Sequence, residues 1–592
     1  MDDPRKQGPQ QGPIDWSEFI KQAQQSGAGA DFNKIKSRFS HLKKRTIIIA
    51  AVVLVLVLAL AYWWFHPAIN IQSIDLWGFL IVILALVTFV LFVFRQIYQT
   101  GMGKREKSPK KVKLFSGLMA IPIAIAVIGA VGWLASQSFF PGNAEKYSTV
   151  LVTEDADFAT DIPEVNYSEI PFIDKDSAIL LGNRTMGTMA DYVSQFEISD
   201  LYSQINYKGQ PVRVSPLNYA DFFKWWANKD GGIPAYVIVN MSTQDTEIVR
   251  LENPIRYSDS DPFFYNVDRH VQLSYPFYMF DEKSFEINDD GEPFWIYPVQ
   301  KRTIGLFGGT TIQRVVLCNA STGECQDFAI EDVPQWVDRA YPAELLIEQY
   351  NWSGALSGGW INSWLGQNGV KQTTPSTDGK SGFNYIAQDD DVWVYSGVTS
   401  ATADNSIIGC VMINQRTAES KFYSVAGATE ESAMRSAEGQ VQHLQYDATF
   451  PLLINVDGQP TYFMALKDAA GLVKMYAMVD IQRCQNVAVG DTLAATEKSY
   501  KQLLVSQGIN VGGSDASAHP STGSTSGTIA SISPVVLDGN SHYYLILDGQ
   551  QAIFDCPVAS VVDVVRYKVG DVIVLNHGSS EGNVVLVDSI GE

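Results

Sequence analysis

Long uncharged stretches dominate the first 140 residues of the chain. Three of them run over Thr46–Phe65, Leu76–Phe94 and Leu114–Phe140, and the third contains Pro122. About 20 helical residues cross a hydrocarbon core of about 30 Å, and a backbone in lipid must satisfy its own hydrogen bonds. The pattern therefore predicts three transmembrane helices, in a transmembrane domain at residues 46–140.

Basic residues flank these stretches unevenly. Lys43, Lys44 and Arg45 precede the first stretch, and the loop 95–113 carries seven Lys or Arg against one acid, whereas the loop 66–75 has no Lys or Arg. Because Lys and Arg are enriched in cytoplasmic loops, the N-terminus is predicted to be cytoplasmic and everything after the third helix extracytoplasmic. We therefore expect a multi-pass protein of the cell membrane.

Residues 1–45 form the predicted cytoplasmic tail. It begins with a Gly/Pro/Gln-rich segment that is typical of disorder. Phe32, Ile35, Phe39 and Leu42 then recur at helical spacing among basic residues. This second part fits either a short amphipathic helix on the inner leaflet or a solvated linker.

Residues 141–510 alternate between helical patterns and short apolar stretches typical of strands. Helical patterns occupy Asp221–Asn228, Pro342–Gln349, Thr429–Gln442 and Thr492–Gln507, and polar N-cap residues begin the last two. An α+β body of repeated helix and β-hairpin units is the predicted fold.

Two short motifs recur in this body. A Gly-x-Pro motif opens apolar strands, and an Asn-x-x-Thr motif lies between strands, where the Asn side chain can close its own backbone turn. The Gly-x-Pro copies begin at Gly209, Gly232, Gly291 and Gly458, and the Asn-x-x-Thr copies begin at Asn240, Asn319 and Asn414.

One copy resembles a known family of small modules. Pro293–Ile330 combines an aromatic-headed strand with the hairpin turn Asn319–Glu324, and in this it resembles the PepSY class of extracytoplasmic modules. The loop Lys301–Thr311 departs from that pattern. The resemblance implies a binding or inhibitory module, often acting towards proteases, and it supplies no catalytic residue.

The C-terminal part separates from the body by composition. Residues 511–527 form a predicted Gly/Ser linker, and residues 528–592 contain five strand patterns and one helical pattern at Ser560–Tyr567. This order resembles an OB-like small β-barrel. Nucleic-acid binding does not follow, because this part holds eight acids and only two bases, Arg566 and Lys568.

The charge of the chain changes sign after the membrane segment. The formal net charge is +9 for residues 1–140 and −30 for residues 141–592, within a total of −21. A strongly acidic exterior repels nucleic acid and anionic lipid, so neither is an expected partner.

All five cysteines lie in the predicted exterior part. Cys318 and Cys325 bracket a hairpin turn and are predicted to face each other, either as a disulfide or as buried free thiols. The odd number leaves at least one thiol without a partner in the same chain. The spacing fits no zinc pattern, and we expect no metal site and no cofactor.

Two aromatic stretches stand out. Tyr350–Gly369 carries Trp352, Trp360 and Trp364 among Gly and Ser, without charge. These three side chains are the candidate partner-binding residues, although a loop packed over the core is the interpretation that the pattern favours. The second stretch, Phe222–Trp226, is predicted to be core.

No catalytic arrangement can be assembled from the sequence. Gly578–Gly582 matches G-x-S-x-G, but a strand follows where a nucleophile elbow needs a helix. The acidic runs 259–261 and 389–391 lack the spacing of a calcium loop, and solvated turns are the favoured interpretation. We therefore predict a protein that is not an enzyme.

The predicted function is binding at the cell envelope. The helices would anchor a repeat body that binds or regulates a protein partner, which the sequence does not identify. The alternative is a self-assembling structural subunit of an envelope or transport complex, with homo-oligomer formation.

Overall fold

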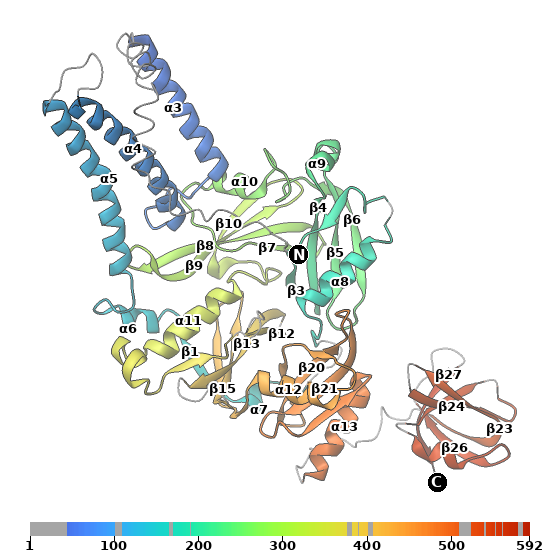
Figure 1. Ribbon diagram of the computed structural model, residues 1–592. Helices are drawn as coiled ribbons and strands as arrows, with labels where there is room; N and C mark the ends of the chain where they lie inside the picture. The colour runs from blue at the N-terminus through green and yellow to red at the C-terminus, as the bar shows by residue number, and fades with distance from the viewer. Residues whose placement is uncertain are drawn as a thin grey trace, which may run out of the picture.

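The computed structural model describes most of the chain after residue 43 (Figure 1). The predicted cytoplasmic segment 1–43, most of the predicted linker and the Gly578–Gly582 motif lie outside the described residues. The described ranges are 44–100, 109–164, 170–189, 191–375, 382–388, 390–400, 406–507, 523–537, 540–550, 552–558, 561–577 and 584–591.

Long apolar helices precede the body: α3 (Lys44–Phe65), α4 (Ile74–Thr100) and α5 (Pro109–Ala135). Among the described residues, α4 and α5 are long and apolar enough to cross a membrane, and the apolar part found in α3 is shorter. Rings of α4 and α5 stack, with the Phe94 and Phe115 centroids 5.6 Å apart.

The third helix ends before the predicted boundary. Residues 136–140 form turns, because the Asn143 side-chain amide donates to the carbonyls of Ala135 and Gln137 at 2.8 and 2.9 Å. A side chain thus satisfies carbonyl groups that would otherwise lack a partner at the helix end.

The body consists of four successive units, each a helix followed by an antiparallel meander of four strands. The first unit is α8 (Lys175–Met186), β3 (Ser203–Tyr207), β4 (Gln210–Tyr219), β5 (Ile233–Asn240) and β6 (Thr246–Ile255). The second is α10 (Val267–Ser274), β7 (Ser284–Ile287), β8 (Pro293–Ile304), β9 (Gly308–Asn319) and β10 (Cys325–Ala329). The third is α11 (Ala343–Leu356), β12 (Asn384–Gln388), β13 (Asp391–Ser400), β15 (Gly409–Asn414) and β16 (Ser420–Tyr423). The fourth is α12 (Glu430–Gln440), β19 (Leu452–Val456), β20 (Gln459–Lys467), β21 (Val473–Asp480) and β22 (Val487–Gly490), and α13 (Leu493–Ser506) follows it.

Shorter elements connect and extend these units. They are α6 (Asn143–Ser148), β1 (Thr153–Ala156), α7 (Phe158–Asp161), β2 (Phe196–Ile198), α9 (Phe222–Asn228), a 3-10 turn (Ile330–Asp332), a π turn (Asn362–Gly366), β11 (Lys371–Thr373), β14 (Ser406–Ile407), β17 (Gly427–Ala428) and β18 (Asp447–Ala448).

The last turn of each meander uses the same side-chain chemistry. The Oδ1 atoms of Asn240, Asn319 and Asn414 each accept the backbone N–H groups two and three residues ahead, at 2.8 to 3.0 Å. In the fourth unit, Asp480 accepts from Gln482 and Arg483 in the same way. This fourth turn does not match the Asn-x-x-Thr motif, because Asp480 and Arg483 stand at its two defining positions, but the Asp carboxylate keeps the acceptor oxygen.

The four sheets follow one another around a common centre, like the blades of a propeller (Figure 1). Shared apolar cores join the second sheet to the third and the third to the fourth. Tyr236 of the first sheet packs on Phe285 of the second, and Lys467 of the fourth pairs with Asp174 beside α8. The ring is therefore closed, and strand β3 lies next to β7 and β13.

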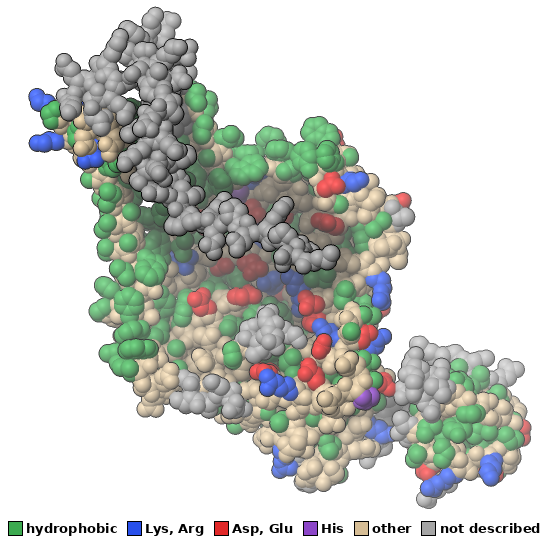
Figure 2. Space-filling model, in the orientation of Figure 1, with side chains coloured by type: hydrophobic (Ala, Val, Ile, Leu, Met, Phe, Trp, Pro, Cys, Tyr) green, Lys and Arg blue, Asp and Glu red, His purple; other side chains and the backbone are tan. Residues whose placement is uncertain are grey.

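The stretch Phe222–Trp226 is not core, contrary to expectation. In α9 only Trp225 is buried, whereas Phe222, Phe223 and Trp226 are 51, 78 and 63% exposed. A short helix at the rim buries one face, and here Trp225 occupies that face, donating its indole N–H to Asp261 at 2.7 Å. Figure 2 shows hydrophobic side chains gathered over α9 and α10.

The C-terminal strands form a closed barrel in the order β23-β24-β25-β27-β26. Gly523–Gly527 belongs to its first strand and not to the linker, because these residues pair with 573–577 of β26. The predicted helix is a short 3-10 turn, η4 (Val562–Arg566). The strands are β23 (Gly523–Leu537), β24 (Asn540–Leu547), β25 (Ile553–Pro557), β26 (Val572–His577) and β27 (Val584–Gly591).

Candidate functional site

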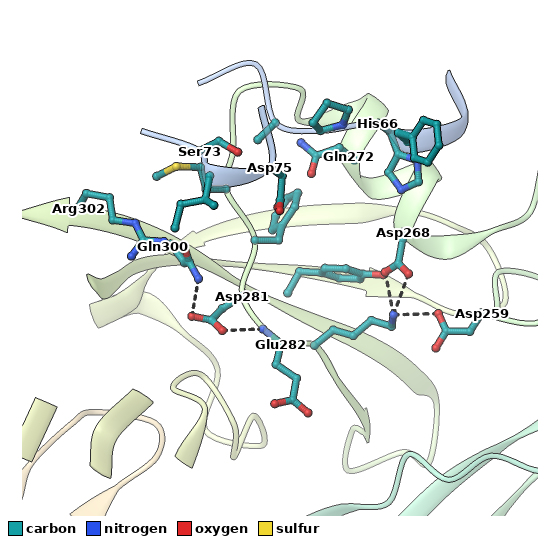
Figure 3. A pocket seen from close by; sticks show the side chains of 18 of the residues that line it. His66, Ser73, Asp75, Asp259, Asp268, Gln272, Asp281, Glu282, Gln300 and Arg302 are labelled. Atoms are coloured by element: carbon teal, nitrogen blue, oxygen red, sulfur yellow. Dashed lines mark hydrogen bonds and ion pairs between the residues drawn. The ribbon is translucent and has the colours of Figure 1, made fainter. Parts of the chain in front are cut away.

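A pocket of about 650 Å³ opens between the loop that joins α3 to α4 and the second sheet of the body. Figure 3 shows its lining, with His66, Ser73 and Asp75 on one side and the 279–283 segment on the other. The loop is fixed on the body because the Ile69 N–H donates to the Pro276 carbonyl at 2.7 Å. The pocket therefore lies where the apolar helices meet the body.

One wall of the pocket is an ion-pair network. The Lys283 ammonium lies 2.9 Å from Asp259 and 2.8 Å from Asp268, and the Tyr297 hydroxyl donates to Asp268 at 2.7 Å. Burial opposes the charge of Lys283, but the two carboxylates raise its pKa. Lys283 is therefore a cation held by protein carboxylates, and it adds no free positive charge to the pocket.

Further carboxylates face the same space. Asp281 accepts from the Gln300 side chain at 2.8 Å, and Asp75 and Glu282 complete the acidic lining. Burial, and then the charge of Arg269, lower the pKa of His66, so this imidazole is neutral at pH 7. Five carboxylates thus outnumber the two permanent cations of the lining, Lys283 and Arg302, and the pocket favours a positively charged group.

The three candidate tryptophans do not form one surface. Trp352 packs edge-on against Tyr147, with ring centroids 4.9 Å apart, and Trp360 packs against Phe139 just after α5. Trp364 stacks on Trp360 and is 68% exposed. The first two thus hold the end of the third helix against the body, and Trp364 alone is mostly exposed.

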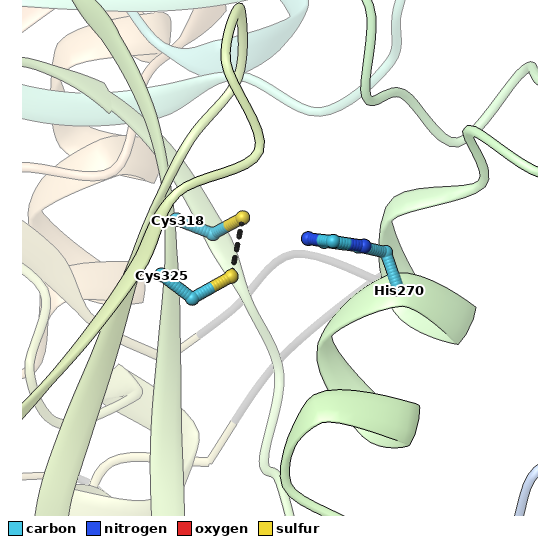
Figure 4. A group of neighbouring side chains, drawn as sticks. All are labelled: His270, Cys318 and Cys325. Carbon is cyan, nitrogen blue, oxygen red and sulfur yellow. Dashed lines mark hydrogen bonds between the residues drawn. The ribbon is translucent and has the colours of Figure 1, made fainter.

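Cys318 and Cys325 face each other, as free thiols, in paired positions of β9 and β10. Their Sγ atoms lie 2.8 Å apart, and His270 of α10 points at both (Figure 4). Of the residues that the structure describes, these three alone form a group with the donor set of a metal site. His270 was not a candidate in the sequence, because only the packing of α10 on the second sheet brings it here.

A second polar cluster lies at the centre of the ring. Glu286 of β7 is fully buried and accepts from Ser284 Oγ and from the backbone N–H groups of Asp338 and Arg339, at 2.7 to 3.2 Å. Asp338 Oδ2 accepts the Asn206 N–H at 2.7 Å, whereas its Oδ1 has no partner. Burial raises the pKa of both carboxyl groups. Figure 2 shows acidic and basic side chains together in the hollow between the second and third sheets.

Comparisons with known proteins identify no relative. No protein-family model matches the chain, and no curated protein matches it. Cobalt-substituted ACO from Synechocystis is a structural neighbour with 8% sequence identity and a TM-score of 0.11. The match covers 50% of this chain and 49% of the ACO chain. A levansucrase variant from B. megaterium has 10% sequence identity and a TM-score of 0.17. The match covers 73% of this chain and 98% of the levansucrase chain. The chain thus spans about half the length of the ACO, and both scores are too low to support a functional argument.

Proposed function

We propose that this protein is a non-catalytic, membrane-anchored binding protein of the cell envelope, with its body on the extracytoplasmic side. The observation that carries the proposal is the acidic pocket between the α3–α4 loop and the second sheet. If α3 and α4 span a membrane, as this proposal holds, an occupant of the pocket lies next to the membrane surface. We infer that it receives a basic group of a protein partner.

Charge supports this choice of partner. The residues after the third helix carry a net charge of −30, and the pocket has three more carboxylates than permanent cations. A field of this sign attracts basic segments and repels nucleic acid. A basic juxtamembrane segment of another membrane protein has both the charge and the height above the membrane that the pocket requires.

The proposal includes three membrane helices with the N-terminus in the cytoplasm. Residues of α3 support the seating of the body on the membrane: the Arg269 guanidinium donates to the Trp63 carbonyl at 3.0 Å and lies 4.0 Å from the Trp63 ring centroid. Phe264, 80% exposed, packs beside the same ring. Aromatic rings at the end of an apolar helix suit the membrane interface.

The module resemblances belong to the same proposal. The helix followed by a meander with an Asn-x-x-Thr turn is the observation that supports the proposal of PepSY-like binding units. The closed C-terminal barrel supports the proposal of an OB-like module, one without nucleic-acid affinity. Both would serve as partner-binding parts of one envelope protein.

Cross-linking tests the proposal. The full chain is extracted in mild detergent, cross-linked and examined by mass spectrometry, alongside an Asp75→Asn/Glu282→Gln variant. We expect a foreign protein whose Lys-rich segment cross-links around the pocket, and at least tenfold less of it with the variant. A Glu154→Gln/Asp191→Asn variant loses the same charge at two exposed positions and should keep the partner.

The opposite result is equally clear. Cross-links only between copies of this chain would favour the alternative, a self-assembling subunit. Equal capture by the pocket variant and its control would remove the pocket from the binding site.

A further inference from the structure

Cys318, Cys325 and His270 form a compact group on the second sheet, separate from the acidic pocket. The N–H of Asn319 donates to the Glu324 carbonyl at 2.9 Å, so the neighbouring pair Cys318–Cys325 falls at a non-hydrogen-bonded position of the ladder. Side chains at such positions approach each other most closely. The register alone therefore brings the two sulfur atoms within bonding reach.

The two thiols differ in accessibility. Cys318 is fully buried, whereas Cys325 is only partly buried and lies in β10, at one edge of the four-stranded sheet. In a pair of this kind the more accessible sulfur meets an external reactant, and the buried sulfur can only react with its neighbour.

His270 lies close to both thiols, with a ring nitrogen within 4.8 Å of each sulfur atom. Its Nε2–H donates to the Gly323 carbonyl at 2.8 Å, and the Tyr257 ring lies 4.3 Å from the imidazole. The hydrogen bond from Cys318, which has the largest effect, and His270 together lower the pKa of Cys325 to about 6, against burial and the weaker effect of Glu324. The interaction with Cys325 raises the pKa of His270, and the other titratable neighbours, Tyr257 and Tyr275, are neutral phenols.

We propose that Cys325 and Cys318 form a thiol–disulfide exchange centre, with Cys325 as the attacking sulfur, Cys318 as the resolving sulfur and His270 as the residue that positions and stabilises the Cys325 thiolate. Its reactant is a disulfide of another protein or of a small thiol. This is a redox activity beyond the binding function, and it does not depend on the pocket.

The exchange balances without any other reagent. The Cys325 thiolate attacks one sulfur of the external disulfide, forming a mixed disulfide and releasing one thiolate. Cys318 then attacks the Cys325 sulfur and gives up its proton to the second leaving thiolate. The external disulfide is reduced to one thiolate and one thiol as the Cys318–Cys325 bond forms, and the reverse sequence reduces that bond.

A competing interpretation is a metal site with a Cys₂His donor set. The His270 Nε2–H donates to the Gly323 carbonyl, which leaves Nδ1 as the ring nitrogen that would bind a metal. A zinc site would keep both sulfurs as thiolates and so prevent exchange.

The test uses the full chain in detergent, equilibrated over a series of ratios of reduced to oxidised glutathione. The thiols are then alkylated, and each cysteine is quantified by peptide mass spectrometry. We expect the Cys318–Cys325 pair to change from dithiol to disulfide within the series. The buried Cys410 and Cys556 should not follow it.

His270→Gln separates an active role from mere proximity. Loss of the imidazolium should lower the ratio of dithiol to disulfide about tenfold at a fixed glutathione ratio, because the thiolate is less stabilised. In a Cys318→Ser background, His270→Gln should raise the pH midpoint of Cys325 alkylation by about one unit. His443→Gln, at an exposed histidine elsewhere, is the matched control and should change neither value.

Three results would overturn the proposal. The first is a pair that stays oxidised at every glutathione ratio, which would make it a structural disulfide. The second is an unchanged ratio and pH midpoint in His270→Gln. The third is binding of one Zn²⁺ per reduced chain, measured by competition with a chromogenic chelator and lost in both Cys318→Ser and His270→Gln.

Discussion

At the scale of single residues, three acidic side chains of the two runs, Asp259, Asp261 and Asp391, already have partners within the protein. Asp391 is 5% exposed, pairs with the Arg416 guanidinium through two bonds of 2.7 and 2.8 Å and accepts from Asn414 at 2.7 Å. It is therefore not in the solvated turn that the sequence favoured. Asp259 pairs with Lys283, and Asp261 accepts from Trp225. Carboxylates with such partners have few lone pairs left for a cation.

Asp338 offers a pH-dependent prediction. Burial first, and then the charges of Glu286, Asp391 and Asp390, raise its pKa, against the effect of the Asn206 N–H. The folded chain therefore holds a proton that the unfolded chain releases above about pH 4, and the free energy of unfolding falls as pH rises above that value. Asp338→Asn removes this penalty, and we expect it to stabilise the protein by about 1 to 3 kcal/mol more at pH 8 than at pH 5.

Denaturant unfolding of the full chain in detergent at the two pH values measures this difference. Asp332→Asn, at an exposed position a few residues earlier, is the control and should change the free energy of unfolding by the same amount at both pH values. A destabilisation by Asp338→Asn that grows with pH would contradict the assignment of a buried, protonated carboxyl group.

At the scale of elements, the third helix is fixed to the tip of the β8–β9 hairpin. Ser136 is fully buried, and its Oγ accepts the backbone N–H groups of Leu306 and Phe307 at 2.9 and 3.0 Å. The Tyr147 hydroxyl donates to the Ser136 carbonyl at 2.7 Å. Gly308 allows this approach, because a Cβ there would lie 2.2 Å from the Tyr147 hydroxyl oxygen.

Replacing Ser136 tests this attachment. Ser136→Ala leaves two partly buried N–H groups without this acceptor, at a cost of about 2 kcal/mol. Amide hydrogen exchange at Leu306 and Phe307 should accelerate about 30-fold in lipid nanodiscs, while exchange in the C-terminal barrel stays unchanged. Ser148→Ala, at an exposed serine nearby, should leave the hairpin protected. Equal protection in the two variants would show that the helix is held elsewhere.

At the scale of the whole molecule, the proposed membrane anchoring predicts that exposed aromatic side chains of the body touch the bilayer. Phe223, Trp226 and Phe264 are mostly exposed, and Phe264 lies next to Trp63 at the end of α3. Apolar groups in such a position are stabilised by contact with the interfacial region of a bilayer.

Fluorescence in lipid nanodiscs tests this contact. Brominated lipid quenches the fluorescence of tryptophans that touch the bilayer. The contribution of Trp226 is the difference in emission between the wild-type protein and Trp226→Phe, and we expect brominated lipid to quench it. Trp225→Phe is the matched control, since Trp225 belongs to the same helix but is buried. The contribution of Trp225 to the emission, obtained in the same way, should not change with brominated lipid. Unquenched Trp226 emission would place α9 away from the membrane.

The sequence by itself determined the local features of this protein. Uncharged stretches predicted the apolar helices because a membrane-spanning helix satisfies its hydrogen bonds within its own segment. Asp221, Thr429 and Thr492 cap helices that begin one residue later, and Asn319 closes its own turn, because these bonds join residues at most three apart. The Asp480 turn did not match the Asn-x-x-Thr motif because Asp480 replaces the Asn and Arg483 replaces the Thr.

Only the tertiary structure decided which distant residues meet. Packing of α10 on the second sheet brings His270 to Cys325, and attachment of the α3–α4 loop to the body creates the acidic pocket. Tertiary packing also places Trp352 against Tyr147, stacks Trp364 on Trp360 and exposes Trp226 on α9. The physical reason is that side-chain burial depends on which faces of sheets and helices meet, whereas turns, caps and membrane helices depend on bonds within a few residues.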